Sequence, residues 1–167
     1  MNQTLAAAAG LLVLLGAATS RAQTIAVGTT LASFSLVDQY GKPHQVDAEV
    51  TAILFTREMG GGDVVKEALA KTKGDLLAQA GVVYVADVSR MPAIIRRVFA
   101  IPSLRRRGYP ILLDTKGSAT KDFPSAEGSA TLLVLQRLRV SSIVHIDAPA
   151  DLEAALQNLL DAARRET

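Results

Sequence analysis

Three short apolar runs, separated by segments of helical periodicity, limit what this chain can fold into more than any other feature. The runs are Val50–Phe55, Gly81–Asp87 and Tyr109–Asp114. Each is apolar and short enough to form a strand that is covered on both faces. The three runs therefore predict the central strands of one sheet.

Two helices are predicted between these runs. The first extends from Gly62 to Ala80, with Asp63 as its N-cap and Gly81 as its stop signal. The second extends from Pro92 to Ala100 and is ended by Pro102. Strands and helices that alternate at this spacing indicate an α/β fold with helices on both faces of the sheet.

Further elements flank this core. They are a strand pair over Ser33–Val37 and His44–Val46, an antiparallel pair over Thr131–Leu135 and Val140–Ile146, and a closing helix over Asp151–Ala163. The prediction is one domain, residues 23–167. It is a three-layer α/β sandwich whose central mixed sheet carries an N-terminal β-hairpin.

Residues 1–22 are predicted to be a secretory signal peptide. The apolar run Leu5–Ala18 is followed by the small residues Ser20 and Ala22, a pattern typical of a leader that is cleaved before Gln23. The run is short for a membrane span, which needs about 20 apolar residues, and an uncleaved anchor is the alternative. A cleaved leader predicts a periplasmic or secreted protein without a stable membrane span.

The composition excludes one class of chemistry. The chain contains no cysteine, so it has no disulfide and no thiol nucleophile. Of its 18 basic residues only Arg21 leaves with the leader, so the rest exceed the 16 acidic residues by one, and this near-neutral balance indicates no particular partner. Aromatic residues make up only 4% of the chain, which argues against nucleic acid as a partner.

Three stretches carry a recognisable pattern. Phe34–Pro43 is similar to a hairpin of the form F-x-L-x-D-x-x-G-K, Tyr109–Gly117 to a strand and turn of the form P-x-L-x-D-x-x-G, and Ala130–Leu135 to the strand before a final strand and helix. In this order they resemble the thioredoxin-like superfamily, in particular its exported TlpA-like, peroxiredoxin-like and YtfJ-type branches. The resemblance spans about residues 27 to 160 and implies a thioredoxin-like fold.

The resemblance also implies where a redox site would lie. The family places a Cys-x-x-Cys at the start of the helix after the first buried strand, and the matching positions here are Met59, Gly60, Gly61 and Gly62. The family's cis-proline matches Ser129 or Ala130, where we expect a trans peptide bond. Both landmarks are replaced, so these positions are interpreted as a vestigial site that has lost dithiol exchange.

The three glycines allow a second interpretation. A glycine-rich loop before a helix presents N–H groups to phosphate, so a cofactor-dependent oxidoreductase that binds a flavin or nucleotide phosphate at Gly60–Gly62 is the alternative. No Lys-Ser/Thr pair follows the glycines, no G-x-G-x-x-G occurs, and Asp63 would repel an anion. We therefore favour a strand-to-helix turn at a vacated site, and no cofactor is predicted.

Other polar residues give weaker signals. Five arginines surround Pro102 and form either a solvated surface or a docking patch for an acidic partner or anionic lipid: Arg96, Arg97, Arg105, Arg106 and Arg107. His44 and His145 lack companions at ligand spacing, and a soft-metal site at Met59 and Met91 is weaker still, so no metal site is predicted. Four carboxylates fall near strand ends, at Glu58, Asp63, Asp87 and Asp114. A Glu58/Asp87 acid–base pair is one interpretation, and capping or turn roles are favoured.

The sequence thus predicts a thioredoxin-like module that binds a protein or peptide and does no thiol chemistry. No catalytic residue is predicted. The face expected to bind is formed by Thr56, Arg57, Glu58, Asp63, Met91 and Pro92, by residues 125–131, and by Arg105, Arg106 and Arg107.

Overall fold

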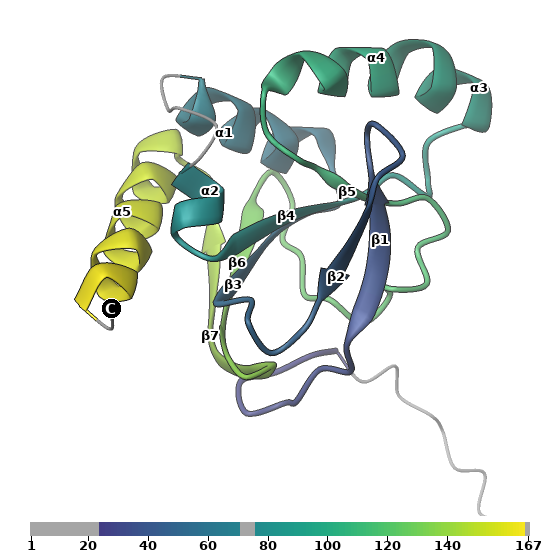
Figure 1. The fold of residues 1–167 in the computed structure, drawn as a ribbon. Coiled ribbons are helices and arrows are strands. Elements are labelled where there is room, and N and C mark those ends of the chain that lie inside the picture. Colours follow the sequence, from purple (N-terminus) through teal and green to yellow (C-terminus); the bar gives the residue numbers. More distant parts are fainter. Residues whose placement is uncertain (1–23, 71–75, 166–167) are drawn as a thin grey trace, which may run out of the picture.

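The computed structural model describes residues 24–70 and 76–165, so the predicted leader lies outside the described residues. Seven strands of the described part form one mixed sheet in the order β2-β1-β5-β4-β3-β6-β7 (Figure 1). These strands are β1 (Phe34–Asp38), β2 (Pro43–Val46), β3 (Ala52–Thr56), β4 (Val82–Asp87), β5 (Leu112–Asp114), β6 (Ala130–Gln136) and β7 (Arg139–Ile146). The predicted α/β class, with its mixed sheet and N-terminal hairpin, is confirmed.

The helices are α1 (Met59–Leu69), α2 (Leu76–Gln79), a continuous helical segment over residues 93–107, and α5 (Pro149–Arg165). The segment at 93–107 is called the 93–107 helix below. It consists of α3 (Ala93–Ile95), a π-helical turn (Arg96–Ala100), α4 (Ile101–Leu104) and a 3₁₀ turn (Arg105–Arg107). No described helix is both long and apolar enough to cross a membrane.

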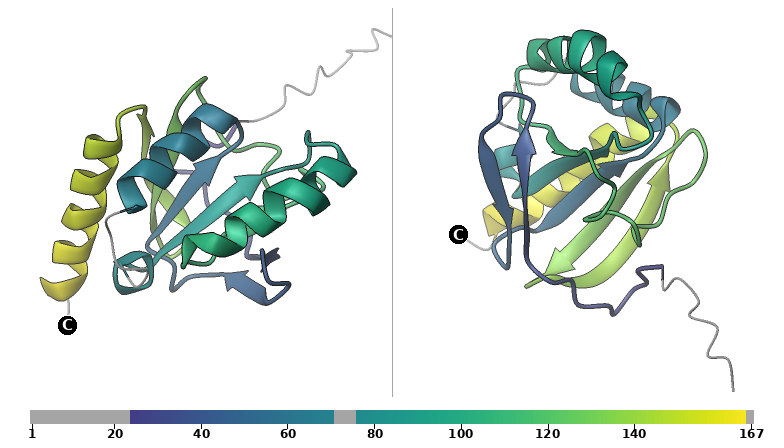
Figure 2. Two further views of the ribbon diagram at one scale, coloured as in Figure 1. Left: turned by 90° about the horizontal axis from the view of Figure 1, so that it is seen from above. Right: turned by 90° about the vertical axis from the view of Figure 1, so that its right-hand side faces the viewer.

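The strands β3, β4 and β5 are parallel neighbours and carry the centre of the fold. The chain steps from β3 to β4 and then to β5 in one direction along the sheet, and crossover connections are right-handed. Two right-handed crossovers in the same direction place α1 and the 93–107 helix on the same face. The prediction of helices on both faces is therefore wrong for the described residues, as the views in Figure 2 show.

The two faces of the sheet have separate apolar cores. Leu54 of β3 and Leu132 of β6 point to the helical side, where they pack with α1, α2 and α5. On the other side, Phe55 is covered by Phe123 and Leu31, which come from segments that are not helical. Loops thus form the third layer of the sandwich.

Helix α1 begins at Met59, so the three glycines form its first turn and do not precede it. The prediction of Asp63 as N-cap is wrong, because Asp63 lies inside the helix. The N-cap is Glu58, which has extended backbone angles and makes no side-chain capping bond. Glycine is a poor helix former, which is why the sequence pattern placed the start later. Gly81 does end the following α2, with a φ of 65°.

The 93–107 helix passes through Pro102, so the prediction that this proline ends the helix is wrong. Proline lacks the N–H that would bond to the carbonyl four residues earlier, and its ring crowds that carbonyl. Just before it the helix widens into a π-turn, in which the Ile101 N–H donates to the Arg96 carbonyl. This widened turn accommodates the proline. The helix ends at Gly108, which adopts a left-handed φ of 74°.

Candidate functional site

A pocket of about 410 Å³ opens between the first turns of α1 and the 93–107 helix, at the carboxyl ends of β3 and β4. Its floor is mostly apolar and contains Tyr84, Tyr109 and Ile111. Charged side chains from α1 and the 93–107 helix, Asp63, Lys66 and Arg107 among them, also line it. Sites in open α/β folds gather at this edge of the sheet, so the pocket is the leading candidate site.

Two methionines lie at this pocket. Met59 is the first residue of α1 and is 83% exposed, while Met91 is half-buried in the loop after β4. Methionine is unbranched and adapts to differently shaped apolar partners. The pocket thus presents an adaptable apolar rim and a rigid aromatic floor.

The glycines of α1 are required by close packing against the segment before β6. A Cβ on Gly60 would lie 2.8 Å from the Cα of Gly128, and a Cβ on Gly61 would overlap the carbonyl oxygen of Ser129. Gly62 differs, because a Cβ there would meet nothing within 4 Å, and it lines the pocket. Backbone-to-backbone contact therefore explains Gly60 and Gly61 without any bound phosphate.

An ion pair between Arg57 and Asp87 joins the ends of β3 and β4. The Arg57 Nε donates to Asp87 Oδ2 at 3.0 Å, and both side chains are mostly buried. The same guanidinium donates to the carbonyl oxygens of Thr120 (2.5 Å) and Phe123 (3.3 Å) and packs over the ring of Phe55. One side chain thus fixes the loop between β5 and β6 to the wall of the pocket.

The electrostatics of this pair follow from its hydrogen bonds. Burial alone would raise the pKa of Asp87, but the bonds from Ser89 and from the Arg57 guanidinium outweigh burial and hold that pKa below its ordinary value. Asp87 is therefore an ionised structural partner. Asp87 bonds to Arg57 and Glu58 is exposed, so this geometry favours a structural role for Asp87 over a Glu58/Asp87 acid–base pair.

The floor of the pocket carries a buried phenol. The Tyr84 hydroxyl is 3.0 Å from Thr56 Oγ1, and burial raises the pKa of Tyr84 to about 12. Burial also raises the pKa of Tyr109, whose ring centroid lies 6.4 Å from that of Tyr84. Both tyrosines are neutral at physiological pH and act as apolar surface with a polar tip.

Comparison with known proteins gives structural matches only. No protein-family model and no curated protein sequence matches this chain. A candidate thiol:disulfide interchange protein (DsbE) of Chlorobium tepidum is 16% identical, with a TM-score of 0.56 over 84% of this chain and 99% of that one. Peroxidoxin BcpB of Mycobacterium tuberculosis is 22% identical, with a TM-score of 0.53 over 81% and 96%. A hypothetical protein of Sinorhizobium meliloti is 26% identical, with a TM-score of 0.52 over 84% and 87%.

The chain has the thioredoxin-like fold. Within it, the positions matched to the family's Cys-x-x-Cys, Met59 to Gly62, form the first turn of α1, as a helix-borne site requires. Ser129 and Ala130 lie against this turn, and no peptide bond among the described residues is cis. The chain has no cysteine anywhere in its sequence, so it cannot exchange dithiols.

The arginines that the sequence grouped together have different surroundings. Arg96 donates to the carbonyl oxygens of Val88 and Met91 and holds the loop after β4. Arg105 donates to the Gln39 carbonyl at 2.9 Å, and Arg107 lines the pocket. Arg97 and Arg106 are exposed. The structure therefore separates the predicted patch into supporting, pocket-lining and exposed side chains.

The other predicted site residues are divided between the pocket and its surroundings. Thr56, Arg57, Glu58, Asp63 and Met91 line the pocket, whereas Pro92 and residues 125–131 do not. Asp114 accepts hydrogen bonds from the Thr120 backbone N–H and hydroxyl and shapes the turn after β5. No cluster of three or more His, Cys, Asp or Glu that could hold a metal ion occurs among the described residues.

Sequence reasoning missed Gln39 as a support of the pocket. Its buried side-chain amide donates to the Tyr109 carbonyl (2.8 Å) and accepts from the Ile111 N–H (2.8 Å). The tip of the β1–β2 hairpin is thereby fixed to the segment that forms the pocket floor. Gln39 occupies a variable position of the hairpin pattern F-x-L-x-D-x-x-G-K. Its place directly after Asp38 in that turn is the only sequence signal for this role.

Proposed function

We propose that this protein is an exported, non-catalytic thioredoxin-like module that binds a peptide or protein partner in the pocket beside Met59. The observation that most supports the proposal is the position of the pocket. It opens beside the helix start where the family's redox pair would stand, in a chain that has no cysteine. Without a thiol at this edge of the sheet, the residues that line the pocket support binding of a partner.

The chemistry of the pocket suits an apolar peptide side chain. A volume of about 410 Å³ lies in the range of ligand sites, which are mainly apolar with a few polar groups that fix orientation. Tyr84 and Tyr109 supply the apolar floor, and exposed Met59 supplies an adaptable rim. Lys66 and Asp63 bring opposite charges to the rim, which suits polar peptide groups better than a strongly charged ligand.

The alternative of a flavin or nucleotide phosphate on Gly60–Gly62 has lost its main support. Gly60 and Gly61 are accounted for by the contact with Gly128 and Ser129, and Asp63 stands in the first turns of the helix. A colourless purified protein with no thermal shift on addition of FMN, FAD or ATP is the expected result. A shift of several degrees would favour the cofactor-dependent oxidoreductase.

A pair of variants at Gly62 tests peptide binding, because this position has open space and lines the pocket. Gly62→Leu should fill the mouth of the pocket, whereas Gly62→Ala should leave it open at similar helix propensity. An array of 15-residue peptides from periplasmic proteins is probed with both variants and the wild type. Peptides held by the wild type should be retained by Gly62→Ala and lost by Gly62→Leu. Equal retention by both variants, or no retained peptide, contradicts the proposal.

Two further measurements test the remaining parts of the proposal. The absence of turnover is tested by insulin reduction and by peroxide consumption with the purified protein, and turnover above background overturns it. Export is tested by cell fractionation and N-terminal sequencing, with a mature chain beginning at Gln23 as the expected result. A cytoplasmic chain that retains residues 1–22 would contradict export.

A further inference from the structure

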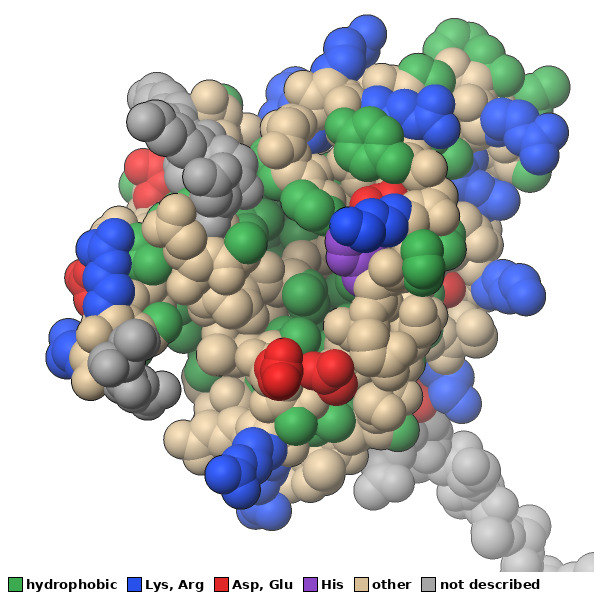
Figure 3. All heavy atoms as spheres, viewed as in Figure 1, with side chains coloured by type: hydrophobic (Ala, Val, Ile, Leu, Met, Phe, Trp, Pro, Cys, Tyr) green, Lys and Arg blue, Asp and Glu red, His purple; other side chains and the backbone are tan. Residues whose placement is uncertain are grey.

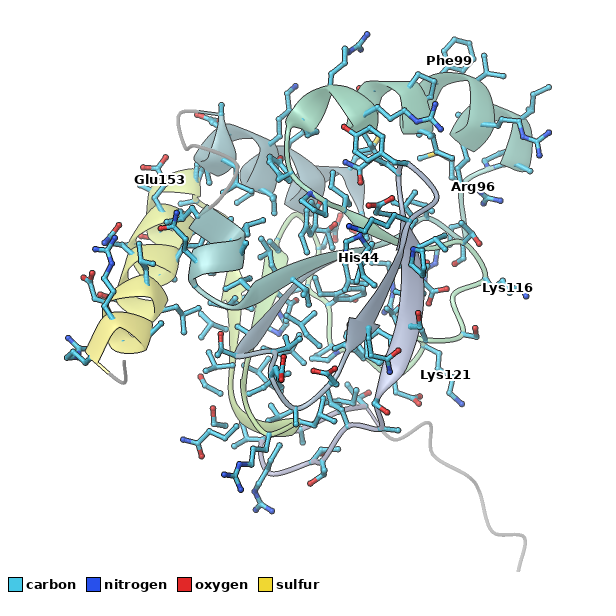
Figure 4. The ribbon with its side chains drawn as sticks, in the orientation of Figure 1. His44, Arg96, Phe99, Lys116, Lys121 and Glu153 are labelled. Atoms are coloured by element: carbon cyan, nitrogen blue, oxygen red, sulfur yellow. The ribbon has the colours of Figure 1, made fainter. Side chains whose placement is uncertain are left out.

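The 93–107 helix turns a row of large apolar side chains toward solvent. Ile94 is 71% exposed, Ile95 43%, Val98 52% and Phe99 65%. In Figure 4 Phe99 points away from the sheet, on the side of the helix opposite the fold. Residues 94, 95, 98 and 99 repeat at helical spacing and form one stripe, called the apolar stripe below. Soluble proteins rarely expose such a continuous row without a binding role.

Only positive charge accompanies this stripe on its helix. Residues 93–107 contain five arginines and no Asp or Glu. Arg97 and Arg106 are exposed, and so is Arg90 in the preceding loop. Figure 3 shows apolar side chains at the outer end of the helix, at the upper right, with Lys or Arg side chains beside them. The surface thus combines exposed apolar groups with a local excess of positive charge.

We propose that the apolar stripe, with Arg97 and Arg106, docks this protein on the surface of an anionic phospholipid membrane. A helix that lies in the membrane interface has bulky apolar residues on one face and basic residues beside them. Each basic residue near an anionic surface strengthens binding about fivefold. The helix is held to the fold by Ile101 and Leu104, which pack against the core, so the stripe is presented on a fixed support.

Charge argues against a second copy of the chain as the occupant. In a symmetric dimer the same patch meets itself, and arginines of one copy would then face those of the other with no acidic residue of this helix between them. An anionic headgroup layer instead complements every exposed charge of the surface. Arg90 also lines the proposed peptide pocket, but Arg97, Arg106 and the residues of the apolar stripe do not. The inference rests on these residues and therefore does not depend on the pocket.

The absence of tryptophan from the chain allows a direct test. Phe99→Trp places a single fluorophore in the stripe, and Val144→Trp places one on strand β7, where the native valine is 43% exposed. The full chain is mixed with vesicles of 3:1 phosphatidylcholine and phosphatidylglycerol, with vesicles of phosphatidylcholine alone, or with polyglutamate. Because both variants share the same N-terminus, a difference between them identifies the surface that enters the bilayer.

In the anionic vesicles we expect the indole of Phe99→Trp to shift its emission to the blue and to be quenched by brominated lipid. The indole of Val144→Trp should do neither. Arg97→Ala with Arg106→Ala should weaken the binding roughly 30-fold. Lys116→Ala with Lys121→Ala removes the same charge from the loop after β5 (Figure 4) and should weaken it much less.

Three results would overturn the proposal. They are an unshifted emission of Phe99→Trp with anionic vesicles, equal behaviour of the two tryptophan variants, and equal loss of binding in the two double variants. An emission shift of Phe99→Trp with polyglutamate and none with anionic vesicles would assign the surface to an acidic polypeptide and would also overturn it.

Discussion

Arg57 and Asp87 join the carboxyl ends of β3 and β4 through a mostly buried ion pair, with 3.0 Å between Nε and Oδ2. Arg57 also donates to the backbone of the loop between β5 and β6. The pair therefore connects the two central strands to the loop that passes beside the pocket. The stability of the pocket wall therefore depends on an ion pair that is mostly buried.

Arg57→Ala should lower the free energy of unfolding by about 3 kcal/mol, because it leaves the Asp87 carboxylate buried without its cation. The measurement is urea denaturation followed by circular dichroism. Arg97→Ala, at an exposed arginine, is the matched control and should change stability by less than about 0.5 kcal/mol. Similar losses for the two variants would show that Asp87 does not depend on its partner.

Gly61→Ala and Gly62→Ala should have opposite effects, although the two glycines are adjacent in one helix. A methyl group on Gly61 meets the backbone of Ser129 and should cost about 1–3 kcal/mol of stability. A methyl group on Gly62 meets open space and should add up to about 1 kcal/mol, because alanine favours helix. Thermal unfolding of both variants gives the comparison, and a stabilised Gly61→Ala would contradict the packing described.

The strands could be predicted because their signal is local. Ile53, Leu54 and Phe55 are all fully buried, so one continuous apolar run was enough to predict a strand that is buried on both faces. The start of α1 could not be predicted in this way. Three glycines disfavour a helix by intrinsic propensity, and only the contact of Gly60 and Gly61 with residues far along the chain explains why they are helical.

The positions of Arg57 and Asp87 could also be predicted from local sequence. Arg57 and Asp87 each follow or end a buried run, so both were expected near the sheet edge. Their pairing depends on the parallel register of β3 and β4, which a single sequence does not give. The passage of the helix through Pro102 likewise depends on a π-turn whose hydrogen bonds have no residue signature.

Stability should fall in acid as the paired carboxylates take up protons. Hydrogen bonds from His44 and from the Lys42 and Tyr40 backbone outweigh burial and lower the pKa of Asp38, as those from Ser89 and Arg57 do for Asp87. A carboxyl with a lowered folded pKa contributes stability that is present above its unfolded value, near 4, and is lost as the pH falls through the folded value. Unfolding free energies should therefore decline below about pH 4.

Asp38→Asn isolates the contribution of Asp38 to the loss of stability in acid. The amide keeps an oxygen that can accept from the Tyr40 and Lys42 N–H groups, but it cannot be protonated in this range. The variant should show a shallower loss of unfolding free energy between about pH 5 and pH 2 than the wild type. An unchanged slope would mean that Asp38 titrates alike in the folded and unfolded states.

Met59→Cys should create a reactive thiol, because Met59 is exposed at the first position of α1. N–H groups at a helix start stabilise a thiolate and lower its pKa below the ordinary value of about 8.5. Val144→Cys, on a strand, is the matched control. The measurement is the pH dependence of alkylation by iodoacetamide. Identical profiles for the two thiols would argue against Met59 as the counterpart of a redox cysteine.

Addition of Gly62→Cys to Met59→Cys tests whether the first turn of α1 can support dithiol chemistry. The second sulfur fits only at Gly62, because Gly60 and Gly61 have no space beside Gly128 and Ser129. The double variant should form an intramolecular disulfide on air oxidation. With dithiothreitol to return this disulfide to the dithiol, it should reduce insulin faster than the wild type does with the same reductant. If it forms the disulfide and stays inactive, the loop at Ser129 and Ala130, which has no proline, would be the part of the site that fails to hold a disulfide substrate. A double variant that forms no disulfide would instead contradict the geometry assigned to the first turn of α1.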